Sequence, residues 1–142
     1  MPIGVVPTSG GGPALLDQTY VLGVAQDRNN TYQNGVTAHA GGTQAAAYQI
    51  VPGAALFEVD TAGAGGTDSI KLYAAVPGHQ ISIFNNTAYT IDIYAYDGYS
   101  NGVSAGDKIN NSSNATAYAL TTYQSATFFC AKAGIWAGVK SA

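Results

Sequence analysis

The residues best suited to chemistry in this sequence are two histidines and one cysteine. His39 lies in an irregular glycine-rich segment, His79 follows Pro77-Gly78 in a turn, and no motif surrounds either. A metal centre needs several ligands at characteristic spacing, which these two histidines lack. Cys130 lies in the apolar run Phe128–Ala131, where free cysteine behaves as a small hydrophobic residue. We therefore expect surface or turn histidines and a buried, inert thiol, without a disulfide inside the chain.

Several acidic residues also have spacings that deserve a chemical interpretation. Glu58 and Asp60 are two positions apart on one face of a predicted strand, as in a pair of catalytic carboxylates. Nothing in their surroundings predicts a raised pKa, so we expect a solvated strand face. Oxygen atoms of Asp97, Asn101 and Asp107 could bind calcium, but their spacing fits no known calcium loop, and turn chemistry is our expectation. The sequence thus predicts no catalytic, cofactor-binding or metal-binding residue and a protein that is not an enzyme.

Tyrosine is the residue type that points most clearly to a function. The chain has ten tyrosines, and a tyrosine buries a large area at low entropic cost while keeping one polar end. Such rings occur at protein interfaces, on sugar-binding platforms and in cores where the hydroxyl group reaches water. A subunit interface is our prediction, with core packing and sugar binding as alternatives. The predicted interface tyrosines are Tyr89, Tyr94, Tyr96, Tyr99, Tyr118 and Tyr123.

Composition limits the classes of partner. Only 9% of the 142 residues are charged, against about 25% in an average globular domain, which suits a β-rich protein whose surface is largely covered by neighbours. The five Lys and Arg residues are scattered and the formal net charge is −3, so no basic patch exists to neutralise phosphates and nucleic-acid binding is not expected. No apolar run approaches the ~20 residues of a membrane span, and no signal peptide is recognisable. We expect synthesis in a cytosol and no membrane partner.

The alternation of apolar and polar residues predicts that β-strands carry these side chains. In the central stretch, Ile81–Tyr96, two strands are predicted to form a hairpin, because Asn85-Asn86-Thr87-Ala88 has suitable turn chemistry. Strands recur at intervals of roughly 8–12 residues, the pattern of a β-sandwich or small barrel, and very little helix is expected. The other predicted strands cover residues 43–51, 55–60, 69–73, 107–110, 116–121, 125–131 and 134–139.

The apolar positions of these strands also predict the core. They recur with a period of two, as one buried face of a strand requires. The predicted core residues are Ile81, Ile83, Ile91, Ile93, Phe128 and Trp136.

Residues 1–40 differ from the rest of the chain. They contain Pro2, Pro7, Pro13 and the run Gly10-Gly11-Gly12, a density of breakers that neither a helix nor a central strand tolerates. A disordered tail is one interpretation. We predict instead an extended arm, residues 1–40, followed by one β-domain, residues 41–142. The apolar arm residues expected at an interface are Ile3, Val5, Val6, Leu15 and Leu16.

Four motifs between Gly42 and Val139 follow one another in a familiar order. They are GTQA at Gly42–Ala45, IKLYAAVPGHQISIFNNTAYTIDIY at Ile70–Tyr94, GDKINN at Gly106–Asn111 and AGIW at Ala133–Trp136. This order resembles a family of small virion structural proteins of tailed bacteriophages. The chain departs from the family pattern at Tyr73, where proline is usual, and in a longer tyrosine-rich loop at Tyr94–Tyr99.

The resemblance implies a virion structural protein, most like a capsid decoration, or cement, protein. Such proteins usually stand as trimers on the outside of the phage head, with arms lying across neighbouring subunits of the major capsid protein. The resemblance therefore implies synthesis in the host bacterial cytoplasm, assembly on the outer surface of the virion, and no cofactor. The alternative is a tail, baseplate or fibre component of the phage, with a possible face that binds host glycans.

Overall fold

The computed structural model describes residues 32–63, 65, 67–98 and 106–142. Within these residues the chain forms strands and no helix, so the predicted all-β class is confirmed. No helix in the described part of the chain is long and apolar enough to cross a membrane. The strands are β1 (Tyr32–Thr37), β2 (Tyr48–Gln49), β3 (Leu56–Thr61), β4 (Ser69–Lys71), β5 (Gln80–Asn85), β6 (Ile91–Tyr94), β7 (Lys108–Ile109), β8 (Tyr118–Leu120), β9 (Ser125–Lys132) and β10 (Ile135–Lys140).

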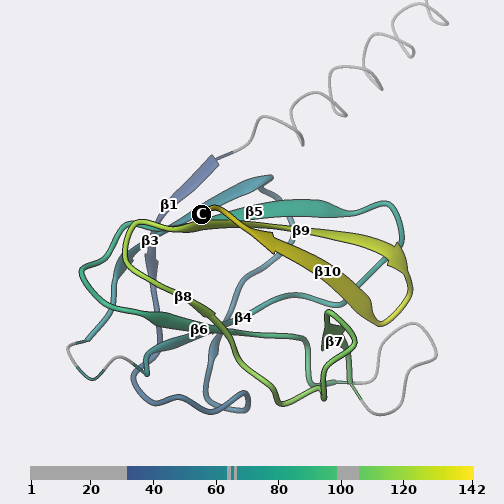
Figure 1. Cartoon of the computed structure of the whole chain (residues 1–142), viewed down its shortest axis with the longest axis horizontal. Helices are drawn as coiled ribbons and strands as arrows, with labels where there is room; N and C mark the ends of the chain where they lie inside the picture. The colour runs from purple at the N-terminus through teal and green to yellow at the C-terminus, as the bar shows by residue number, and fades with distance from the viewer. Residues whose placement is uncertain (1–31, 64, 66, 99–105) are drawn as a thin grey trace, which may run out of the picture.

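The strands form two sheets, which Figure 1 shows as an upper and a lower layer. Sheet A has the order β1-β3-β5-β9-β10-β7, and sheet B has the order β2-β4-β6-β8. The first six strands alternate between the sheets and pair in parallel within each of them. The chain therefore winds as three coils of a solenoid-like stack, with roughly two dozen residues per coil. Strands β8 and β9 then return antiparallel to β6 and β5.

This topology corrects two predictions. The central stretch is not a hairpin, because β5 lies in sheet A and β6 in sheet B, and the turn-like residues 85–88 carry the chain across between them. The sheets are a solenoid-like stack rather than the predicted sandwich or small barrel. The reason for both errors is that a period of two identifies the buried face of a strand but not the strand with which it pairs.

The core lies between the two sheets. The six predicted core residues are each at most 1% exposed, which confirms that part of the analysis. Trp136 donates a hydrogen bond from Nε1 to the Tyr73 carbonyl oxygen at 3.2 Å, and the two rings meet edge to face with centroids 5.5 Å apart. Tyr73 thus contributes to the packing around the tryptophan. Cys130 is 3% exposed, as predicted.

The β-domain begins earlier in the chain than the predicted boundary at residue 41. Residues 32–37, which the sequence placed in the arm, form β1 and pair in parallel with β3. The arm can therefore comprise at most residues 1–31, which lie outside the described residues together with Ile3, Val5, Val6, Leu15 and Leu16.

Candidate functional site

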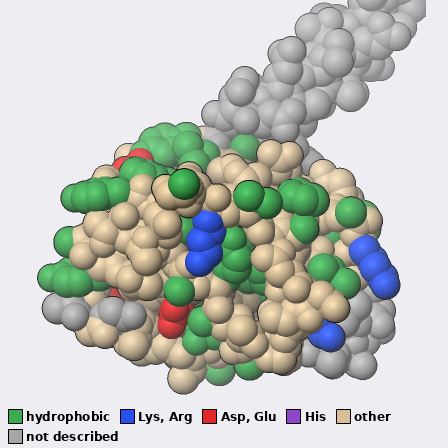
Figure 2. Space-filling view, viewed as in Figure 1, with side chains coloured by type: hydrophobic (Ala, Val, Ile, Leu, Met, Phe, Trp, Pro, Cys, Tyr) green, Lys and Arg blue, Asp and Glu red, His purple; other side chains and the backbone are tan. Residues whose placement is uncertain are grey.

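The outer face of sheet A is a broad, mostly uncharged surface. One row of residues crosses five strands in register, from Tyr32 through Leu56, Ser82 and Thr127 to Val139. The exposed fraction is 52% for Tyr32, 38% for Leu56 and 62% for Val139. The neighbouring rows add the side chains of Phe84 and of Phe129, which is 44% exposed. We call these residues the sheet A face. Figure 2 views the two sheets from the side, and charged side chains are also few on the surface visible there.

An acidic corner borders this face on β3. Asn86 donates from its amide to Glu58 at 2.6 Å and to Asp60 at 3.2 Å, Gly35 donates its N–H to Asp60, and the Tyr32 hydroxyl group donates to Glu58. Desolvation and the adjacent charge of Asp60 raise the pKa of the Glu58 carboxyl group, which the sequence did not predict. These contacts link β1 to β3, so the pair has a structural role in addition to being solvated.

Two of the predicted interface tyrosines are exposed and lie on loops fastened to one residue. Tyr89 is 38% exposed and Tyr123 is 66% exposed. The buried side chain of Asn85 donates from Nδ2 to the Tyr89 carbonyl oxygen at 2.7 Å, and the Tyr123 N–H donates to the Asn85 carbonyl oxygen at 2.9 Å. Tyr123 has a φ of 58°, a left-handed conformation that is unusual for a bulky residue. The fold therefore holds both tyrosines outward at one end of the molecule.

The other predicted interface tyrosines are not gathered on one surface. Tyr94 is only 6% exposed, and its hydroxyl group donates to the Gly42 carbonyl oxygen at 2.6 Å, so this ring packs inside the domain instead of facing a partner. Tyr118 is partly buried against Phe128, with ring centroids 5.2 Å apart. Tyr96 is partly buried, and Tyr99 lies outside the described residues.

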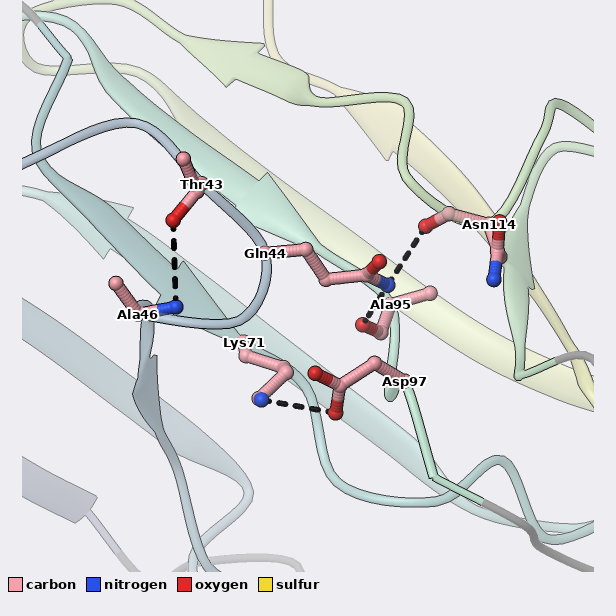
Figure 3. Close-up of polar contacts among 7 residues, drawn as sticks. All are labelled: Thr43, Gln44, Ala46, Lys71, Ala95, Asp97 and Asn114. Atoms are coloured by element: carbon pink, nitrogen blue, oxygen red, sulfur yellow. Dashed lines mark hydrogen bonds and ion pairs between the residues drawn. The ribbon is translucent and has the colours of Figure 1, made fainter.

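A polar cluster covers the outer face of sheet B. The segment from residue 40 to 47 lies over this face, and Gln44 donates from its amide to the carbonyl oxygens of Ala95 at 2.8 Å and Asn114 at 2.7 Å (Figure 3). Beneath it, Lys71 forms an ion pair with Asp97 at 2.9 Å. The Lys71 side chain is only 8% exposed. Burial raises the pKa of the neighbouring Asp92.

These contacts give the cluster a structural role. Hydrogen bonds and an ion pair tie together residues that are far apart in the sequence, such as Gln44 with Asn114 and Lys71 with Asp97 (Figure 3). The polar cluster fixes the covering segment to sheet B, whereas the sheet A face and the exposed tyrosines are open to a partner in the described part of the chain.

The remaining titratable residues do not converge. The backbone of His39 bonds to Ser69 in sheet B, whereas the backbone of His79 bonds to Cys130 in sheet A. Burial raises the pKa of the Cys130 thiol, which disfavours the reactive thiolate. Asp107 is fully buried and accepts the Ala75 N–H at 2.5 Å. Among the described residues, no group of three or more His, Cys, Asp or Glu side chains lies close enough to hold a metal ion.

The sequence analysis missed the sheet A face. Its signal was present, because β3, β5 and β9 carry Leu56, Phe84 and Phe129 at the positions that alternate with the core. Apolar residues on both faces of a strand indicate that both faces are covered in some state.

Comparison of the chain with models of protein families, with curated proteins and with solved structures finds no match. The resemblance to phage structural proteins therefore stays a prediction.

Proposed function

We propose that this chain is a non-enzymatic structural protein that decorates the outside of a bacteriophage head. It bridges subunits of the major capsid protein and so stabilises the shell. Two things support the proposal: the order of motifs between Gly42 and Val139, and the exposed sheet A face. The sheet A face is the observation that carries it, because a contiguous, weakly charged sheet surface is suited to binding another protein.

The size of the sheet A face favours attachment by many weak contacts. Five strands at about 4.8 Å spacing, each about six residues long, span roughly 20 Å by 20 Å, or about 400 Å². A stable interface buries about 800 Å² on each partner. One copy alone therefore binds weakly, whereas a homotrimer presents three faces and three arms at once, and linked weak contacts give tight attachment.

Stabilisation of the head follows from the same contacts. A protein that binds the assembled shell and not its free subunits raises the stability of the shell by mass action. The segment that precedes β1, residues 1–31, is proposed to contact neighbouring capsid subunits through Ile3, Val5, Val6, Leu15 and Leu16. In this proposal the protein is made in the host bacterial cytoplasm and resides on the outer surface of the virion, with no nucleic-acid or membrane partner.

A sedimentation assay with purified heads tests this function. Wild-type protein should co-sediment with heads and raise their thermal stability. Val139→Lys adds a charge to the middle row of the sheet A face and should release the protein from heads without unfolding it, because Val139 is 62% exposed. Tyr123→Lys, on the loops at one end, is the matched control and should bind as wild type. Equal binding by the Val139 variant and wild type, or no binding by either, would contradict the proposal.

A second candidate is a tail, baseplate or fibre component that binds host glycans. The observation that favours it is the outward placement of Tyr89 and Tyr123, since exposed tyrosine rings can stack on sugars. Tyr123→Ala should then lower adsorption of virions to host cells and signals on a glycan array. This candidate would be excluded if Tyr123→Ala virions adsorb to host cells as wild type does while the Val139→Lys protein no longer binds heads.

A further inference from the structure

Strand β1 carries an asparagine-glycine pair at a break in its pairing with β3. The register is irregular between Gln33 and Val36, so that Asn34 and Gly35 together lie opposite the single β3 residue Glu58. Both residues of the pair are exposed. Gly35 has a φ of 72°, and apart from its chain neighbours no atom lies within 4 Å of the place where a Cβ would stand. The bulge therefore presents the pair to water.

An exposed asparagine followed by glycine can modify itself. The peptide nitrogen of the glycine attacks the side-chain carbonyl carbon of the asparagine, because no glycine side chain hinders the approach. The N–Cγ bond forms, the Cγ–Nδ2 bond breaks, and Nδ2 leaves as ammonia with the proton of the peptide nitrogen. Water then opens the five-membered imide ring at either carbonyl and gives aspartate or isoaspartate. The only co-reactant is water.

One contact bears directly on the attacking nitrogen. The Gly35 N–H donates to the carboxylate of Asp60 on β3. The attack requires this N–H to lose its proton, which leaves negative charge on the nitrogen. An adjacent carboxylate opposes that charge and holds the proton in place. The other carboxylate of the acidic corner, Glu58, accepts from the Tyr32 hydroxyl group instead. Asp60 is therefore the group that acts on the reaction.

We propose that Asn34 is a site of spontaneous modification, converted to aspartate and isoaspartate by way of the Gly35 nitrogen, and that Asp60 slows this conversion. The inference goes beyond the proposed function and does not depend on it. Conversion places a new carboxylate opposite Glu58, and isoaspartate adds one atom to the main chain of β1. Converted protein should therefore pair β1 less firmly with β3.

The test is to age the full chain in mildly alkaline buffer, folded and in urea, and to follow Asn34 by peptide mass spectrometry that separates aspartate from isoaspartate. Asp60→Asn keeps a hydrogen-bond acceptor and removes the charge. It should speed conversion in the folded protein about fivefold, the effect of one unit charge at contact distance in water. In urea, where the contact is lost, the variant should convert at the wild-type rate. Asn34→Gln should not convert, because its imide ring is larger and forms far more slowly.

Two controls separate the charge of Asp60 from a loosened strand. Glu58→Gln removes the neighbouring charge, which does not bond to Gly35, and should change the rate less than Asp60→Asn does. Hydrogen exchange of the β1 amides should show that Asp60→Asn leaves β1 paired. If Asn34 stays intact in both folded proteins while it converts in urea, the site is wrong. An unchanged rate in Asp60→Asn, or a faster rate that comes with opening of β1, overturns the role of Asp60.

Discussion

Asn85 should be the most sensitive polar residue in the domain. Its side chain is fully buried and donates from Nδ2 to three carbonyl oxygens: Tyr89 at 2.7 Å, Leu120 at 2.9 Å and Thr121 at 3.1 Å. Its Oδ1 accepts from the N–H and the hydroxyl group of Thr87. One amide therefore fastens the connection after β5 to the turn after β8.

Removing this amide leaves several buried polar groups without a partner. Each buried group that loses its hydrogen bond costs about 1–3 kcal/mol. Since some of the groups around Asn85 can reach water after a small shift, we expect Asn85→Ala to lower the free energy of unfolding by about 3–5 kcal/mol, a large share of the 5–15 kcal/mol typical of a domain. Asn85→Asp should cost at least as much at neutral pH, because a carboxylate replaces the donor and faces carbonyl oxygens.

Urea unfolding followed by the fluorescence of Trp136, the single tryptophan, measures this difference at fixed protein concentration. Asn86→Ala is the control. It removes a neighbouring amide that donates to the carboxylates of Glu58 and Asp60 at the protein surface, and it should cost less than about 1 kcal/mol. A loss of less than 1 kcal/mol for Asn85→Ala, or equal losses for the two variants, would refute the reasoning.

Three further predictions concern titratable groups. The folded protein keeps a proton on Glu58 at pH values where the unfolded chain has released it. The free energy of unfolding should therefore fall as the pH rises from the ordinary pKa of 4.5 through the raised value. Glu58→Gln should flatten that slope in a pH series of unfolding curves. Lys71→Met should cost about 1 kcal/mol or less, because its partner Asp97 is 34% exposed and solvent screens the pair, and a larger loss would contradict this. Cys130 should react with a thiol reagent far more slowly in native protein than in urea, and equal rates would show that the thiol is not buried.

The local structure was largely predictable from the sequence. Alternating residues identified most of the strands, although not β1, and all six predicted core positions, since burial of one strand face leaves a period of two in the sequence. The pairing of those strands was not predictable in the same way. Asn85-Asn86-Thr87-Ala88 has the composition of a hairpin turn, yet Asn85 is buried and its amide bonds to Leu120 and Thr121, which are distant in the sequence.

The candidate site was predictable only in part. Tyr89 and Tyr123 are exposed as an interface requires, but Tyr94 is covered because the segment around Gly42 lies over sheet B. The residues that flank Tyr94 in the sequence do not predict its contact with Gly42. The sheet A face depends on the register between distant strands, which places Tyr32 beside Leu56 and Thr127 beside Val139. Such surfaces depend on which strands pair with each other, so the residue pattern within a single strand does not predict them.

The most direct test of the proposed function is an electron cryomicroscopy reconstruction of phage heads incubated with the full chain and with its Val139→Lys variant. We predict additional density on the outer surface of the head, in contact with more than one major capsid protein subunit through the sheet A face, and its loss with the variant. Bare heads with the wild-type protein, or density confined to the tail, would contradict the account.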